Sequence, residues 1–141
     1  MTKFIGLDVG SKTIGVAISD GYFARPYLTI KFQEDNFIEA ANKLDTLLKE
    51  KKFKKIIVGY PKNMDGSLGH RIEMVELFLK NLYEICNVLS SDIVKIDERL
   101  TTRMAKSLMR EVDMNQKKQK ENKDQLAAKI ILDIYLQQIN M

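Results

Sequence analysis

The stretch F-I-G-L-D-V-G-S-K-T-I-G-V-A-I-S-D, residues 4–20, decides the fold. Residues 4–9 predict a covered strand, Gly10-Ser11-Lys12 predicts a turn, and residues 13–19 predict a second strand rich in β-branched side chains. Two strands joined so tightly form a hairpin. Asp8 lies inside this hairpin, where a carboxylate loses its hydration unless it is paired, hydrogen-bonded or bound to a cation. Asp8 is therefore the first candidate functional residue.

The remaining chain alternates between strand and helix patterns. A strand at 27–32 follows Arg25-Pro26, apolar residues at helical spacing run from Phe37 to about Lys52, and the continuous apolar run 55–60 predicts a strand covered on both faces. Further on we expect a helix at about 70–86, a strand at 93–96, a helix at about 103–110 and a final helix from Lys123 or Asp124. The result is an α/β chain with three antiparallel and two parallel strands in one mixed sheet.

Composition describes an ordinary globular protein. The 141 residues suffice for one domain, and their net charge of +4 is mildly basic. The single cysteine, Cys86, excludes an intramolecular disulfide and fits a reducing compartment. No apolar run approaches the length of a membrane span, so we expect a cytoplasmic protein without a membrane partner.

Two lysine clusters hold much of the positive charge. Residues 49–55 close a helix, where cations suit the helix dipole, and a solvated face is the favoured interpretation. Residues 117–123 overlap with the segment 111–122, which is almost without apolar residues and predicts a mobile connection. For this second cluster, a solvated segment and a nucleic-acid contact are equally supported.

Three carboxylates lie at positions that packing alone does not explain. Asp8 is inside the first strand, Glu98 follows the last strand and Asp124 begins the final helix. Ligands of open α/β sheets gather outside the carboxyl ends of the strands, where these residues can meet. Oxygen donors without a histidine or cysteine set suit Mg²⁺ or Mn²⁺. Alternatively, Asp124 serves only the helix dipole and Glu98 only pairs with Arg99.

Four segments resemble the YqgF/RuvX family of Holliday-junction-resolvase-like proteins. They are L-D-V-G-S-K-T-I-G-V-A-I-S-D (7–20), I-V-G-Y-P-K-N-M-D-G-S (57–67), D-E-R-L-T-T (97–102) and D-Q-L-A-A-K-I-I-L (124–132), in the family's order. The resemblance implies one RNase H-like nuclease domain over residues 1–141, with strand order 3-2-1-4-5 and about four helices. Tyr60, Leu68 and His70 depart from the family's usual pattern, and this puts substrate preference in doubt more than catalysis.

The resemblance also implies a function. We expect a divalent-metal nuclease that uses two Mg²⁺ or Mn²⁺ ions held by Asp8, Glu98 and Asp124 and that matures the 5′ end of pre-16S rRNA. The alternatives are a Holliday junction resolvase acting on branched DNA and a nucleic-acid-binding protein that does not cleave. A monomer suffices for RNA trimming, whereas a resolvase requires a homodimer. The expected phosphate-positioning residues are Gly10, Ser11, Lys12, Lys62, Asn63, Arg71, Arg99, Lys117, Lys118 and Lys120.

Overall fold

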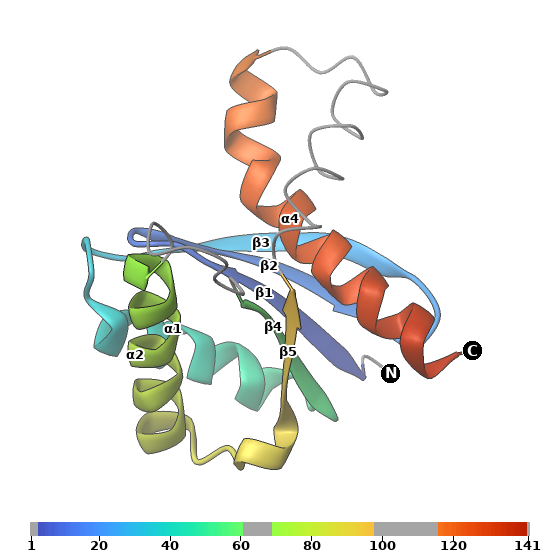
Figure 1. Ribbon diagram of the computed structural model, residues 1–141, viewed down its shortest axis with the longest axis horizontal. Helices are drawn as coiled ribbons and strands as arrows, with labels where there is room; N and C mark the ends of the chain where they lie inside the picture. Colours follow the sequence, from blue (N-terminus) through green and yellow to red (C-terminus); the bar gives the residue numbers. More distant parts are fainter. Residues whose placement is uncertain (1–2, 61–68, 98–115, 141) are drawn as a thin grey trace.

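The computed structural model describes residues 3–60, 69–97 and 116–140, with residues 116–122 described only by their backbone. Five strands form one sheet in the order β3-β2-β1-β4-β5 (Figure 1). The β1–β2 and β2–β3 pairs are antiparallel, and the β1–β4 and β4–β5 pairs are parallel. This confirms the predicted mixed sheet and its strand order. The strands are β1 (Phe4–Val9), β2 (Thr13–Ser19), β3 (Ala24–Lys31), β4 (Lys55–Tyr60) and β5 (Ile93–Asp97).

Three α-helices and a short 3-10 helix occur in the described residues. They are α1 (Phe37–Glu50), α2 (Gly69–Cys86), η2 (Ser90–Asp92) and α4 (Gln116–Ile139). Helix α1 begins at an asparagine N-cap, because the Asn36 side-chain oxygen accepts a hydrogen bond from the Glu39 amide at 3.0 Å. The helix predicted at about 103–110 lies outside the described residues.

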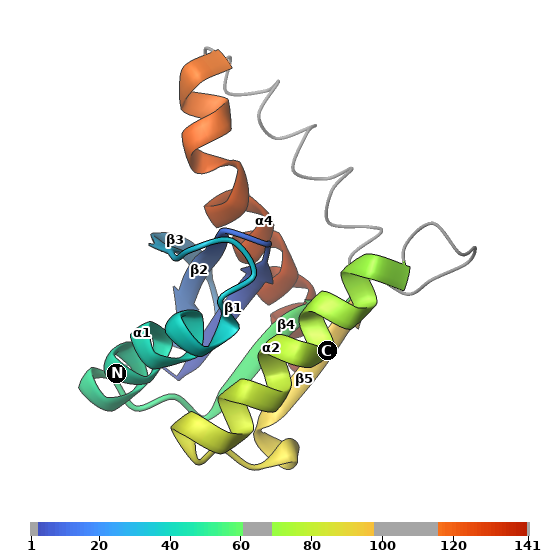
Figure 2. The same cartoon turned by 90° about the vertical axis from the view of Figure 1, so that its left-hand side faces the viewer.

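The helices cover the sheet on both faces. Helices α1 and α2 lie together on one face, and α4 crosses the other (Figures 1 and 2). Each face has its own core, since alternate residues of a strand point to opposite sides. Ile5, Leu7 and Val9 of β1 belong to the core under α1 and α2, whereas Phe4 packs in the core under α4. By the same alternation, Asp8 lies on the α4 face of the sheet.

The structure corrects the predicted start of β3. The strand begins at Ala24 instead of Tyr27, and it includes Pro26, which pairs with Ala17. Proline has no amide hydrogen for the ladder, so it is confined to positions such as an edge strand, and β3 is an edge of this sheet.

The predicted start of the last helix is also wrong. Helix α4 begins at Gln116, so residues 116–122 are helical instead of forming a connection. Lysine, glutamine and glutamate have high intrinsic helix propensity, and a helix that is solvated on all sides shows no apolar periodicity. The first turns of α4 rise away from the sheet (Figure 1).

Candidate active site

Helix α4 approaches the sheet most closely at Gly15. A Cβ added to Gly15 would overlap the main-chain carbonyl group of Asp124 and lie 2.8 Å from the Gln125 amide nitrogen. A Cβ on Gly6 would likewise lie 2.8 Å from the Ala128 carbonyl oxygen. Alanine at either position would push the helix outward, so the two glycines allow α4 to contact the sheet through its backbone.

This contact places two of the predicted carboxylate residues on the same face of the sheet. Asp8 pairs directly with Gly15 across the β1–β2 ladder. Opposite residues of an antiparallel pair extend to the same face, so Asp8 lies on the face where α4 seats Asp124. The side chains of both residues are partly buried.

Two hydrogen bonds, each with a threonine of the sheet, fix α4 over β2 and β3. The Thr13 hydroxyl donates to Oδ2 of Asp124 at 2.7 Å, and the Gln125 amide nitrogen Nε2 donates to the Thr29 hydroxyl at 2.9 Å. Asp124 lies within α4, eight residues after its first residue, Gln116. The alternative that Asp124 serves only the dipole at the start of the last helix is therefore wrong.

The turn between β1 and β2 is held by its backbone. The Gly10 amide donates to the Thr13 carbonyl oxygen at 2.8 Å, and the Ser11 carbonyl oxygen accepts from the Asp35 amide at 2.7 Å. The Gly10 amide is thus used within the turn. Of the three predicted phosphate-positioning residues here, Ser11 and the exposed Lys12 keep that role as a prediction.

The other predicted site residues are only partly placed. Arg71 lies in the first turn of α2, and its side chain is partly buried. The backbones of Lys117, Lys118 and Lys120 belong to the first turns of α4. Lys62, Asn63, Glu98 and Arg99 lie outside the described residues. Within the described part of the chain, no three acidic, histidine or cysteine side chains form a metal-binding group. The described residues do not include Glu98, which is the predicted third carboxylate.

The donor set fits a hard divalent cation. Asp8 and Asp124 offer carboxylate oxygens on one face of the sheet, and the neighbouring Thr13 adds a hydroxyl. Such oxygen ligands are the ones that Mg²⁺ and Mn²⁺ prefer. The one histidine of the chain, His70, lies exposed at the start of α2.

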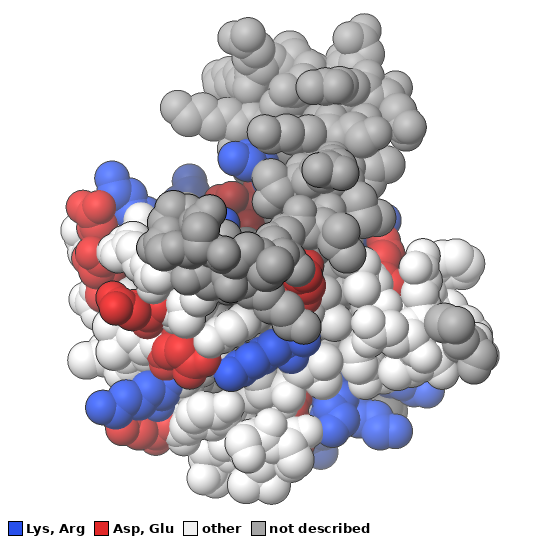
Figure 3. Space-filling model, viewed as in Figure 1, with Lys and Arg blue, Asp and Glu red and all other residues white. Residues whose placement is uncertain are grey.

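Charges of both signs lie side by side on the α1–α2 side of the molecule (Figure 3). Helices α1 and α2 contribute to ion pairs, namely Lys43–Glu39 at 3.1 Å within α1 and Lys95–Glu76 at 3.0 Å between β5 and α2. Glu76 takes a lowered pKa from its hydrogen bond with Lys95. The positive charges of Lys43 and Lys95 are therefore offset by acidic side chains.

Sequence reasoning missed Thr13, Gly15 and Gln125 as parts of the site. A signal for one of them existed, because glycine inside a strand often marks a close backbone approach, and Gly15 stands in the middle of a β-branched run. The hydrogen bonds of Thr13 and Gln125 join residues 111 and 96 positions apart, and no local pattern reveals such pairs.

The family model described as "RuvX: Holliday junction resolvase" matches residues 2–138. A relative from Mesoplasma florum is 48% identical over 141 residues, covering 99% of both chains. One from Shouchella clausii is 44% identical over 136 residues, covering 95% of this chain and 94% of its own. Both relatives carry the name "Putative pre-16S rRNA nuclease".

Solved structures support the fold. Thermus thermophilus RuvC superposes with a TM-score of 0.53 at 11% identity, covering 98% of this chain and 96% of that one. RuvC from the same organism in complex with a Holliday junction substrate gives a TM-score of 0.53 at 10% identity, covering 74% and 68%. With the strand order, these neighbours confirm the predicted RNase H-like fold. Among the described residues, no helix is long and apolar enough to span a membrane.

Proposed function

The chain belongs to the RuvX family, and from this premise we propose that it is a divalent-metal nuclease that matures the 5′ end of pre-16S rRNA. The observation that carries the proposal is the backbone contact between α4 and Gly15, which seats Asp124 on the same face of the sheet as Asp8. The names of the relatives from M. florum and S. clausii support the choice of substrate.

We assign Asp8, Asp124 and the undescribed Glu98 as the residues that hold Mg²⁺ or Mn²⁺. When bound, the metal activates a water molecule for attack on the phosphodiester and stabilises the leaving oxygen. The Thr13 hydroxyl donates to Oδ2 of Asp124, and this hydrogen bond fixes the orientation of the carboxylate. Thr13 is thus a positioning residue.

Binding of the RNA backbone falls to residues around this edge of the sheet. We assign phosphate contacts to Ser11 and Lys12 of the β1–β2 turn, to Arg71 at the start of α2 and to the lysines 117, 118 and 120 of α4. Because α4 is continuous from Gln116 through Asp124, its lysine-rich first turns lead directly to the carboxylate. Replacement of the three lysines by alanine should weaken RNA binding and flatten its salt dependence.

The proposal is tested with purified protein and a pre-16S rRNA fragment, in Mg²⁺, in Mn²⁺ or in EDTA. We expect cleavage at the 5′ end with either metal, none in EDTA, and a loss on the order of 1000-fold in Asp8→Asn and in Asp124→Asn. Asp133→Asn is the matched control, since Asp133 lies on the same helix and pairs with Lys129. Cleavage that persists in EDTA or in Asp8→Asn contradicts the proposal.

Resolution of Holliday junctions is the second candidate, favoured by the family model that matches the chain. A four-way DNA junction, incubated under the same conditions, separates it from RNA maturation. Symmetric cutting of two strands requires a dimer, so light scattering of the active sample belongs to the same experiment. Tight binding of both substrates without cleavage in any metal would instead show a protein that binds nucleic acid without cutting it. The rRNA substrate places the proposed activity in the cytoplasm.

A further inference from the structure

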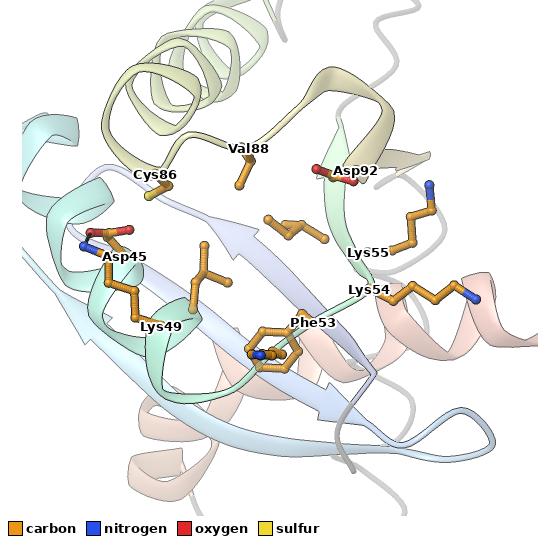
Figure 4. A pocket seen from close by; sticks show the side chains of 11 residues that line it. Asp45, Lys49, Phe53, Lys54, Lys55, Cys86, Val88 and Asp92 are labelled. Carbon is orange, nitrogen blue, oxygen red and sulfur yellow. Dashed lines mark ion pairs between the residues drawn. The ribbon is translucent and has the colours of Figure 1, made fainter.

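A cavity of about 410 Å³ lies at the edge of the sheet opposite to the carboxylates (Figure 4). It opens where α1 ends, where β4 begins and where the chain leaves α2. Strand β4 begins at this cavity and ends at the active-site edge, so about 20 Å separates the two sites, given a rise of about 3.3 Å per residue. The lining residues are Asp45, Leu48, Lys49, Lys52, Phe53, Lys54, Lys55, Ile56, Cys86, Val88 and Asp92.

The floor of the cavity is apolar. Leu48, Phe53 and Val88 pack against the core with one side and remain partly exposed on the other, and Ile56 lies buried beneath them. The Phe53 ring and Val88 line the cavity from two different segments of the chain (Figure 4). An aromatic side chain beside an apolar floor is suited to a flat, weakly polar group such as a nucleobase.

The rim of the cavity carries more positive charge than its acids neutralise. Lys49 pairs with Asp45 at 2.9 Å, and the Lys55 ammonium donates to the Ser91 carbonyl oxygen at 2.6 Å. The Asp92 carboxylate accepts from the Leu89 amide at 3.0 Å. Two exposed lysines remain.

Those two lysines are Lys52 and Lys54. Within the described part of the chain, their side chains make no hydrogen bond or ion pair. Stabilisation of the helix dipole does not account for them, since α1 ends at Glu50 and its last turn already holds Lys49. The two lysine ammonium groups could bind an anionic group, and the apolar floor beside them could bind a planar ring attached to it.

We propose that this cavity binds a nucleoside monophosphate, with the base on Phe53 and its apolar neighbours and the phosphate on Lys52 and Lys54. The nucleotide is either free or the terminal residue of an RNA strand. The site is separate from the carboxylate edge and does not depend on the proposed nuclease activity.

The test is a titration of ¹⁵N-labelled protein with AMP and GMP, without divalent metal, followed by amide chemical shifts. We expect shifts confined to residues around the cavity, and weaker binding of adenosine and of inorganic phosphate than of AMP. The double variant Lys52→Glu/Lys54→Glu should weaken AMP binding at least tenfold, whereas Lys80→Glu, an exposed change on α2, should not. Phe53→Leu, which keeps the core filled, should weaken AMP binding but not phosphate binding.

Three results would overturn the proposal: shifts scattered over the surface, AMP affinity that survives the double charge reversal, or adenosine binding as strongly as AMP. The source of the nucleotide is decided with the Asp8→Asn protein, to prevent cleavage, and a short RNA with either a 5′-phosphate or a 5′-hydroxyl. Tighter binding of the phosphorylated RNA than of AMP, with shifts at the same amides, identifies an RNA end. AMP binding as tightly as the RNA identifies a free nucleotide.

Discussion

The two faces of strands β1 and β2 are built from different kinds of residue. The face under α1 and α2 carries large branched side chains, namely Ile5, Leu7, Val9, Ile14, Val16 and Ile18. Apart from Phe4 at the start of β1, the face under α4 carries small or polar ones, namely Gly6, Asp8, Thr13, Gly15, Ala17 and Ser19. The first face supplies apolar burial, and the second lets a helix reach the backbone of the sheet and bring a carboxylate with it. Stability and chemistry are thus divided between alternate residues of the same strands.

Gly15→Ala should have the largest effect, because it should lower both the stability of the protein and its nuclease activity. The added methyl group overlaps the Asp124 carbonyl group, so α4 must move away from the sheet, at a cost of about 3 kcal/mol or more in the free energy of unfolding. Nuclease activity should fall with it, because Asp124 moves with the helix. Denaturant unfolding and RNA cleavage measure both effects. Gly69→Ala is the control: in the described part of the chain, no atom beyond its own neighbours and the nearby helix backbone lies within 4 Å of the added Cβ, and we expect a change of at most about 1 kcal/mol.

Ile18→Ala should lower stability without affecting the chemistry. Ile18 is fully buried on the opposite face and pairs with Ile5, far along the ladder from Asp8. Removal of its side chain leaves a cavity and should cost about 2–5 kcal/mol. The cleavage rate per folded molecule, measured well below the melting temperature, should stay within about twofold of the unmodified protein. A larger loss of activity would show that the two faces are coupled.

Thr13→Val and Thr29→Val should distinguish a residue that orients the Asp124 carboxylate from one that only helps to hold α4 on the sheet. Each removes one hydrogen bond between the sheet and α4, so each should cost about 1 kcal/mol of stability. Only Thr13 contacts the carboxylate, so only Thr13→Val should lower cleavage and raise the Mg²⁺ concentration needed for half-maximal activity. Equal activity in the two variants would contradict the positioning role.

The smallest effect should come from the Lys95–Glu76 pair on the α2 side. Their hydrogen bond is the largest cause of the lowered Glu76 pKa and of the raised Lys95 pKa. Ionised Glu76 contributes to the free energy of unfolding above its ordinary pKa of 4.5. This contribution is lost as the pH falls through the lowered pKa of Glu76 in the folded protein. Protonated Lys95 contributes to the free energy of unfolding at pH values below its ordinary pKa of 10.5. This contribution is lost as the pH rises through the raised pKa of Lys95 in the folded protein.

Because the two side chains are 43% and 47% exposed, Glu76→Gln should cost only about 0.5 kcal/mol near neutral pH. Thermal unfolding of the variant and the unmodified protein at pH 3, pH 7 and pH 12 measures the difference. It should shrink at both extremes, and a difference that is constant across this range would contradict the assignment. Cleavage activity should not change.

Much of the fold could be predicted because β1 and β2 alternate clearly and because residues 55–60 form a continuous apolar run. Asp8 could be identified because it interrupts a strand of otherwise apolar or small residues. The start of α4 could not, since residues 116–122 contain no apolar residue that would show a helical period, and intrinsic propensity is the only helical signal in that part of the sequence. The early start of β3 was hidden because Pro26 argues against a strand unless that strand is known to lie at an edge.

The sequence could indicate which residues belong to the candidate site, but it could not show how they are arranged in space. The motifs identify Asp8 and Asp124, and only the structure shows that a missing side chain at Gly15 brings α4 over Asp8. The sequence also did not predict the lysine-rich cavity at the end of α1, because its lining residues are distant in sequence. The lysines at 49–55 suggest a solvated face, and the apolar floor that changes this interpretation includes Val88, which is distant in sequence.

The backbone contact at Gly15 also separates the position of α4 from the carboxylate that we propose as a metal ligand. Since α4 meets Gly15 through the main chain of Asp124 and Gln125, this contact does not depend on which side chain residue 124 carries, and a substitution there loses only the hydrogen bond with Thr13. The ligand can therefore be exchanged, for example by Asp124→Glu or Asp124→His, while the helix keeps its place. This makes position 124 a starting point for redesigning the metal preference of the enzyme by a single substitution.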